Sequence, residues 1–245
     1  MKKLIAIALA MVMVLALAAC GGEQTPPATD PAPATDPAPN TDDVKVMTYA
    51  EYDAAALDSK VVVECYVQAT QSWWDNKITV YAQDKDGAYF LYEMACSEAD
   101  AAKLTAGTKI RVTGVKGAWE GEVEIMEGTF EFVEGADTFI AEPKDVTALL
   151  GTDDLIKDQN KLVAFKGMTI KAIEYKNGEP GDDIYVTVTK DNADYSFCVE
   201  RYLTGPETDV YKAFADLKAG DVVDIEGFLY WYQSVNTHIT AVAKA

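Results

Sequence analysis

The sequence is short of basic residues and almost without histidine, and each shortage excludes a class of function. It has 21 Lys and Arg residues against 40 Asp and Glu residues, which gives a formal net charge of −19. Acidic residues outnumber basic ones in every segment after residue 19. Long-range repulsion therefore opposes polyanionic partners, which normally bind through Lys and Arg. The single histidine, His238, offers no specific Ser-His-Asp or Cys-His set, and its alternating segment 237–240 predicts a solvent-facing strand residue.

Short motifs with a known chemistry are also missing. The chain has no G-x-G-x-x-G, P-loop, HExxH or CxxC sequence. Acidic pairs such as Asp182-Asp183 lack the full series of oxygen ligands that a dedicated calcium loop carries. The sequence therefore predicts a protein that is not an enzyme and that uses no cofactor and no metal ion.

The long apolar run of the chain lies at its N-terminus. Lys2 and Lys3 precede an apolar stretch at 4–17, and the tetrapeptide Leu-Ala-Ala-Cys ends at Cys20. This pattern resembles the lipobox of bacterial lipoproteins, which implies a signal peptide at 1–19 and a diacylglyceryl thioether on the Cys20 sulfur. The run is shorter than the roughly 20 residues of a membrane-spanning helix. The resemblance implies a lipid anchor at the extracytoplasmic face of the cell membrane.

A low-complexity segment follows the cysteine. Residues 20–43 are rich in Pro, Thr and Ala, and the unit ATDPAP occurs twice in succession. The segment has no apolar side chain large enough to build a core, and its prolines favour an extended polyproline II chain. We expect a disordered tether here.

The remainder of the chain alternates as β-strands do, and its second half repeats the order of the first. Period-two alternation marks strands, acidic turns join them, and one short helix is expected in each half. The spacing from Gly107 to Gly220 equals the spacing from Gly114 to Gly227. The repeat predicts two domains of similar fold, at 44–142 and 143–245.

Each half has three strands, a short helix and two further strands. This order resembles the OB-fold, a five-stranded, partly open Greek-key barrel. The resemblance covers nearly the whole chain after residue 43 and rests on the pattern of elements, without a residue signature. It implies a mostly β protein with two tandem OB-type barrels, each with one short helix between its third and fourth strands. A β-sandwich is the alternative, and the position of the helix argues against it.

The OB resemblance also implies a place for a ligand. OB-folds bind on the face of strands 2 and 3, between the loops that join strands 1–2 and 4–5. In the first half these loops fall at 71–77 and 116–121 and contain three of the four tryptophans, which we expect to meet at one barrel mouth. Exposed aromatic rings there would stack on a sugar ring or a base. The expected ligand-binding residues are Trp73, Trp74, Asp75, Tyr81, Tyr92, Trp119 and Glu120.

An alternative reading makes the tryptophans structural. Either Trp73 or Trp74 then plugs the end of the barrel, and Trp119 covers its core. Successive side chains in an extended segment point to opposite sides, so one of the two neighbours should be exposed in either case.

Three cysteines remain once Cys20 is assigned to lipid. Their number is odd, so Cys65, Cys96 and Cys198 cannot all pair within the chain. Cys65 and Cys96 share a half and either form a disulfide or remain thiols. Cys198 is expected to be a small buried hydrophobe.

These observations predict a non-catalytic binding module on a cell-surface lipoprotein, with a glycan or peptide as ligand at the mouth of the first barrel. The expected partners are the membrane, through the Cys20 anchor, and a glycan or protein ligand; acidity disfavours nucleic acid. Two alternatives stay open: a single-stranded nucleic-acid-binding protein, by analogy of fold, and a structural or assembly protein of the cell envelope.

Overall fold

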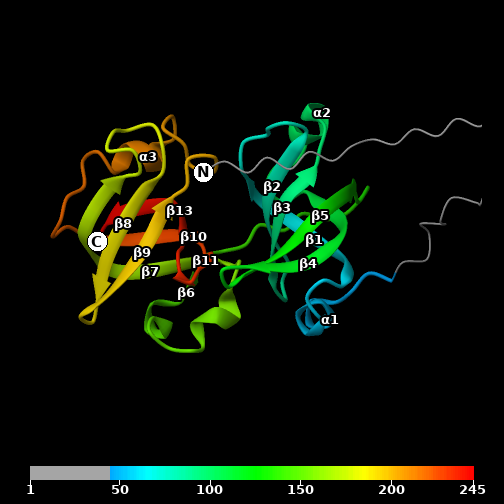
Figure 1. The fold of residues 1–245 in the computed structure, drawn as a ribbon, viewed down its shortest axis with the longest axis horizontal. Coiled ribbons are helices and arrows are strands. Elements are labelled where there is room, and N and C mark those ends of the chain that lie inside the picture. The colour runs from blue at the N-terminus through cyan, green and yellow to red at the C-terminus, as the bar shows by residue number, and fades with distance from the viewer. Residues whose placement is uncertain (1–44) are drawn as a thin grey trace, which may run out of the picture. The chain divides into compact units, whose positions relative to one another are not determined.

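The computed structural model describes residues 45–245, which fold into two β-barrels (Figure 1). The described residues belong to one compact unit. The expected signal peptide, Cys20 and the tether lie outside the described residues and stay predictions. In the described part of the chain, no helix has the length and apolar character needed to cross a membrane.

The first barrel closes in the strand order β1-β2-β3-β5-β4. Its third and fifth strands run parallel and the other neighbours are antiparallel. A buried cluster of Val, Ile, Leu, Met, Cys and Tyr side chains fills its interior. Its elements are α1 (Tyr49–Ala54), β1 (Lys60–Thr70), β2 (Lys77–Gln83), β3 (Ala88–Ala95), α2 (Glu98–Ala101), β4 (Lys109–Trp119) and β5 (Glu122–Phe132).

The second barrel repeats this order with a separate core. Strand β13 pairs with β9 in parallel, and β10 pairs with β7, which closes the ring. The elements of this barrel are β7 (Leu162–Tyr175), β8 (Ile184–Lys190), β9 (Ala193–Val199), α3 (Asp209–Ala213), β10 (Val222–Phe228) and β13 (His238–Lys244). Short elements join and extend it: β6 (Lys144–Asp145), η2 (Thr147–Leu149), η3 (Leu155–Asp158), β11 (Trp231–Tyr232) and β12 (Ser234–Val235).

The predicted fold class is confirmed: both barrels are of the OB type and carry their helix between the third and fourth strands. Local chemistry forms these elements as expected. The Asp84 carboxylate accepts hydrogen bonds from the backbone N–H groups of Asp86 and Gly87, at 2.7 and 2.8 Å, and so closes the β2–β3 turn. The Ser97 hydroxyl accepts from the N–H of Asp100 and caps the start of α2.

One residue expected in a loop lies instead in a buried strand position. Lys116 belongs to β4, and its Nζ donates to the backbone carbonyls of Tyr52, Asp53 and Ala55 at 2.9, 2.7 and 3.0 Å. These carbonyls lie at the C-terminal end of α1, where a cation is stabilised, and that of Tyr52 also accepts from the backbone N–H of Ala55. Lys116 is thus explained by the end of the helix and is not available to a ligand.

The outer face of β2 and β3 is buried against the second barrel, although the alternating sequence predicted an exposed face there. Tyr81, Phe90 and Phe228 form a buried cluster, and the rings of Tyr81 and Phe228 stack with their centroids 4.5 Å apart. Tyr81 is only 1% exposed. The expected role of Tyr81 in ligand binding is therefore wrong, because the contact between the barrels covers its ring.

His238 is part of the same contact, so the expectation of a solvent-facing side chain is also wrong. It is 7% exposed, its ring stacks on Tyr230, and its Nδ1 lies 2.5 Å from the Tyr81 hydroxyl. Burial lowers the pKa of His238 to about 3, so the ring is neutral. Gln71 donates to the Tyr81 oxygen at 3.2 Å, which leaves the Tyr81 proton for His238.

Two of the four glycines that indicated the repeat lie at irregular positions in equivalent strands. Gly114 in β4 and Gly227 in β10 both sit where the pairing register shifts. A Cβ on Gly227 would lie 2.3 Å from the carbonyl oxygen of His238, and one on Gly114 would lie 2.8 Å from that of Met126. Side-chain methyl groups of Ile125 and Thr237 also lie 2.5 and 2.8 Å from these two Cβ positions, so neither position has room for a larger residue.

We expect Gly114→Ala and Gly227→Ala each to lower the free energy of unfolding by about 1–3 kcal/mol, because the added methyl group must displace backbone. Chemical unfolding of residues 43–245 measures this loss. The controls Thr113→Ala and Glu226→Ala lie beside them on the same strands and should cost under about 1 kcal/mol. Equal losses in the glycine variants and their controls would contradict the packing explanation.

Candidate functional site

The loop between β1 and β2 ends in a tight turn that exposes one tryptophan. The backbone N–H groups and carbonyls of Trp74 and Lys77 exchange hydrogen bonds at 3.1 and 2.9 Å. Asp75 and Asn76 between them have φ values of 47° and 59°, as a type I′ turn requires. Trp74 is 80% exposed. Asp75 is thus explained by turn geometry, since Asp and Asn tolerate positive φ.

Trp73, by contrast, points toward the first barrel. Its indole N–H donates to the carbonyl of Cys96 at 2.8 Å, and its ring packs against the core. The expectation that one of the two neighbouring tryptophans is exposed is confirmed.

A bulge in β3 adds a second exposed aromatic ring beside Trp74. The pairing of β2 with β3 shifts register between Ile78 and Val80 on the β2 side. Glu93 opposite has a φ of 44°, and its N–H donates to the Thr79 hydroxyl at 3.1 Å. Consecutive side chains Tyr92 and Glu93 are consequently both exposed, Tyr92 at 42%.

The second barrel completes the site with a turn that follows β9. The carbonyl of Tyr202 accepts hydrogen bonds from the N–H and hydroxyl of Ser72 at 2.8 and 3.3 Å, which docks this turn on the β1–β2 loop. The Arg201 guanidinium lies 5.1 Å from the centre of the Tyr202 ring, and Tyr202 is 53% exposed. Sequence reasoning missed both residues because it treated the halves separately, although Arg201 is one of only two arginines in the chain.

These segments enclose a cavity of about 710 Å³, which we call the Trp74 pocket. Two basic and two acidic side chains line it, and Lys77 forms an ion pair with Glu93 at 2.8 Å. The lining is therefore close to neutral in a strongly acidic chain. The residues of the Trp74 pocket are Gln71, Ser72, Trp73, Trp74, Asp75, Lys77, Ile78, Thr79, Tyr92, Glu93, Arg201 and Tyr202.

The remaining expected site residues lie at the other end of β3. Trp119 is 59% exposed and flanks the tight β4–β5 turn, where Glu120 has a φ of 49°. The pairing of β3 with β5 places the β4–β5 turn beside the start of β3. The pairing of β2 with β3 places the β1–β2 turn, which carries Trp74, beside the end of β3. The eight residues of β3 separate the turns by ~23 Å. Trp119 and Glu120 do not line the Trp74 pocket, so the three tryptophans do not converge.

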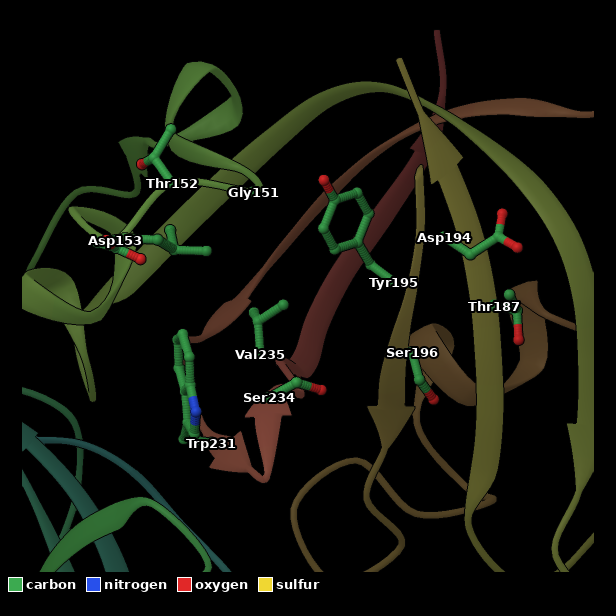
Figure 2. Close-up of a pocket in the computed structure, with 11 residues that line it drawn as sticks. Gly151, Thr152, Asp153, Thr187, Asp194, Tyr195, Ser196, Trp231, Ser234 and Val235 are labelled. Atoms are coloured by element: carbon green, nitrogen blue, oxygen red, sulfur yellow. The ribbon is translucent and has the colours of Figure 1, made fainter. Parts of the chain in front are cut away.

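A second cavity of about 520 Å³ lies on the second barrel, which we call the Trp231 pocket (Figure 2). Residues of β8, β9 and the β11–β12 hairpin line it together with a segment at 151–155. Within the described residues, no group of three or more His, Cys, Asp or Glu side chains is placed to hold a metal ion. Cys65, Cys96 and Cys198 are free thiols, each buried.

Between the β4–β5 turn and the second barrel lies a fully buried carboxyl group. Glu122 is 0% exposed, and one of its oxygens accepts from the N–H of Trp231 at 2.7 Å and from the amide of Gln159 at 3.2 Å. The other oxygen has no partner among the described residues. Loss of water around the carboxyl raises the pKa of Glu122 to about 9, so the group is protonated at neutral pH.

This raised pKa predicts a pH-dependent stability. The folded state holds the Glu122 proton more tightly than the unfolded state, so its contribution is complete below about pH 4.5 and is lost as pH rises toward 9. Glu122→Gln keeps the size and stays neutral. We expect the melting temperature of Glu122→Gln, relative to the natural chain, to rise between pH 5 and pH 8 in calorimetry. The exposed control Glu127→Gln should show no such rise, and a flat difference for Glu122→Gln would refute the buried neutral acid.

Comparison with known proteins gives no match to any family model and no match among curated sequences. Solved structures do match, at low identity. A murine DNA-binding protein bound to double-stranded DNA is 11% identical, with 76% of this chain and 100% of that chain covered and a TM-score of 0.36. The Ifi202 HINa domain in complex with DNA is 9% identical, and the match covers 76% of this chain and 100% of that domain with a TM-score of 0.37. The p202 HIN1 domain, also solved with double-stranded DNA, is 10% identical over 77% and 94%, with a TM-score of 0.35.

These comparisons contradict the expected function and partners. The neighbours are described as bound to DNA, whereas we expected a cell-surface lipoprotein module for a glycan or peptide, with a membrane anchor as partner and nucleic acid disfavoured. The lipobox itself lies outside the described residues.

Proposed function

We propose that residues 43–245 form a non-catalytic module that binds single-stranded nucleic acid, with an unpaired base in the Trp74 pocket. The observation that carries the proposal is the gathering of three exposed aromatic rings around an arginine. Trp74, Tyr92 and Tyr202 come from the first strand-joining loop, from strand 3 and from the second barrel, and all three line one cavity beside Arg201. Base stacking on aromatic side chains contributes about 1–3 kcal/mol per base in such sites.

The location supports the same ligand. OB-folds use strands 2 and 3 and the adjoining loops to bind oligonucleotides. Here the second barrel covers most of that face, and the Trp74 pocket is the part left open at the end of β3. Gln71 and Thr79 add polar groups at its wall, and Lys77 and Arg201 can each approach a phosphate.

Charge determines which form of nucleic acid fits. A net charge of −19 repels the dense phosphate charge of a duplex, and a duplex hides its base faces in the stack. A single strand presents free base faces and needs few phosphate contacts. Two cations, Lys77 and Arg201, correspond to a shallow dependence of log affinity on log salt, with a slope of about −1.4.

A short labelled oligothymidylate, titrated with residues 43–245 and followed by fluorescence anisotropy, tests the proposal. We expect saturable binding that Trp74→Ala weakens by about 1–3 kcal/mol, because the ring that stacks on the base is removed. Trp119→Ala is the matched control, since Trp119 is equally an exposed tryptophan in a hairpin but lies outside the pocket.

Arg201→Ala should weaken binding and reduce the salt slope by about 0.7, the value for one phosphate contact on a single strand. Equal losses for Trp74→Ala and Trp119→Ala, tighter binding of the duplex than of the single strand, or no binding at low salt would each refute the proposal.

A further inference from the structure

The Trp231 pocket occupies the face of the second barrel that corresponds to the covered face of the first. In both barrels this face belongs to the second and third strands, here β8 and β9. In the first barrel Tyr81 and Phe90 on this face are buried by the contact between the barrels. The face on β8 and β9 stays open, and its cavity of about 520 Å³ is large enough for a small organic molecule.

Two aromatic rings wall the pocket, and both are held in place. The backbone N–H of Trp231 donates to Glu122, and a Cβ on Gly121 would lie 2.7 Å from Cδ1 of the Trp231 ring. Tyr195 packs partly against the second core, and its hydroxyl oxygen lies 3.3 Å from where a Cβ on Gly151 would be. Figure 2 shows the two rings with Val235 between them.

Most polar side chains of the Trp231 pocket can accept hydrogen bonds, and no described residue in its lining is a Lys, Arg or His. The hydroxyl groups come from Thr152, Thr187, Ser196 and Ser234. Two carboxylates also line it. Asp194 is neutralised by an ion pair with Lys171, whereas the Asp153 side chain forms no ion pair or hydrogen bond with any residue in the described range 45–245.

We propose that the Trp231 pocket binds an organic cation, a protonated alkyl amine of the polyamine class. The faces of Trp and Tyr rings attract an ammonium group, by about 0.5–2 kcal/mol according to its desolvation. Asp153 supplies the opposite charge, and the hydroxyl oxygens accept the ammonium N–H groups. The methylene chain of the amine lies along Trp231, Leu155 and Val235.

The field of the whole chain favours the same ligand. A net charge of −19 raises the local concentration of cations and lowers that of anions near every cavity. The Trp74 pocket offsets this field with Lys77 and Arg201, whereas none of the described residues that line the Trp231 pocket is a Lys or Arg. The amine site is therefore independent of the proposed nucleic-acid site.

Isothermal titration calorimetry of residues 43–245 with cadaverine, at constant ionic strength, tests the proposal. Cadaverine should bind saturably and shift the indole N–H NMR signal of Trp231. The diol of the same chain length should give neither heat nor shift, because it lacks the charge. Binding of the diol or of glucose as tight as that of cadaverine, or heats no larger than those of added sodium chloride, would overturn the proposal.

Variants of two neighbouring carboxylates distinguish specific binding in the pocket from general attraction of cations to the acidic chain. Asp153 lines the pocket, whereas Asp154 beside it pairs with Lys157 and does not line the pocket. Asp153→Asn should weaken cadaverine binding by about two- to fivefold, the range for an exposed ion pair. Asp154→Asn removes the same formal charge and should leave the affinity unchanged. Equal weakening by both variants, with unfolding midpoints unchanged, would show diffuse attraction and refute the site.

Discussion

The stack of Tyr81 on Phe228 is the contact on which the rest of the structure depends, because it joins the two barrels through the face that an OB-fold usually offers to ligands. Phe90 extends the cluster on the first barrel, and Tyr230 packs against it from the second. Full burial of an aromatic side chain contributes on the order of 1.5–3 kcal/mol. The cost is a closed ligand face on the first barrel, which leaves only its edge, at Tyr92, open to solvent.

The same contact forces two titratable groups into neutral forms. His238 and Glu122 are buried where the barrels meet, and the loss of water on burial disfavours the charged form of each. Acid lowers stability through the histidine, since its pKa falls to about 3 and the unfolded chain takes up the proton first. Rising pH lowers stability through the glutamic acid, whose contribution is lost progressively from about pH 4.5 toward pH 9. Burial of neutral polar groups thus confines the joined barrels to the middle of the pH range.

The sequence predicted what is local and repeated, and missed what the two halves do to each other. Asp84 closes a turn, Ser97 caps a helix, and the duplicated glycines mark equivalent strands. The alternation of apolar and polar residues in the strands was then sufficient to predict the fold class. The predicted ligand-binding role of Tyr81 was wrong because alternation distinguishes the two faces of a strand but does not show that a second barrel covers the outer face. Arg201 was missed for the same reason, because its place in the Trp74 pocket depends on docking between halves.

Duplication followed by asymmetric docking explains why two equivalent faces end with different chemistry. Docking buries the first face and brings Arg201 and Tyr202 to its remaining edge, so the open part gains a cation and an aromatic ring from the other barrel. The second face receives structural support from the first barrel, where Glu122 and Gly121 contact Trp231 and where Glu120 accepts hydrogen bonds from Gln233. It keeps its hydroxyl groups and Asp153, which forms no ion pair within the described residues 45–245. A nearly neutral aromatic pocket and an acidic aromatic pocket thus arise from one fold, and the difference between them follows from which barrel contributes side chains to the other.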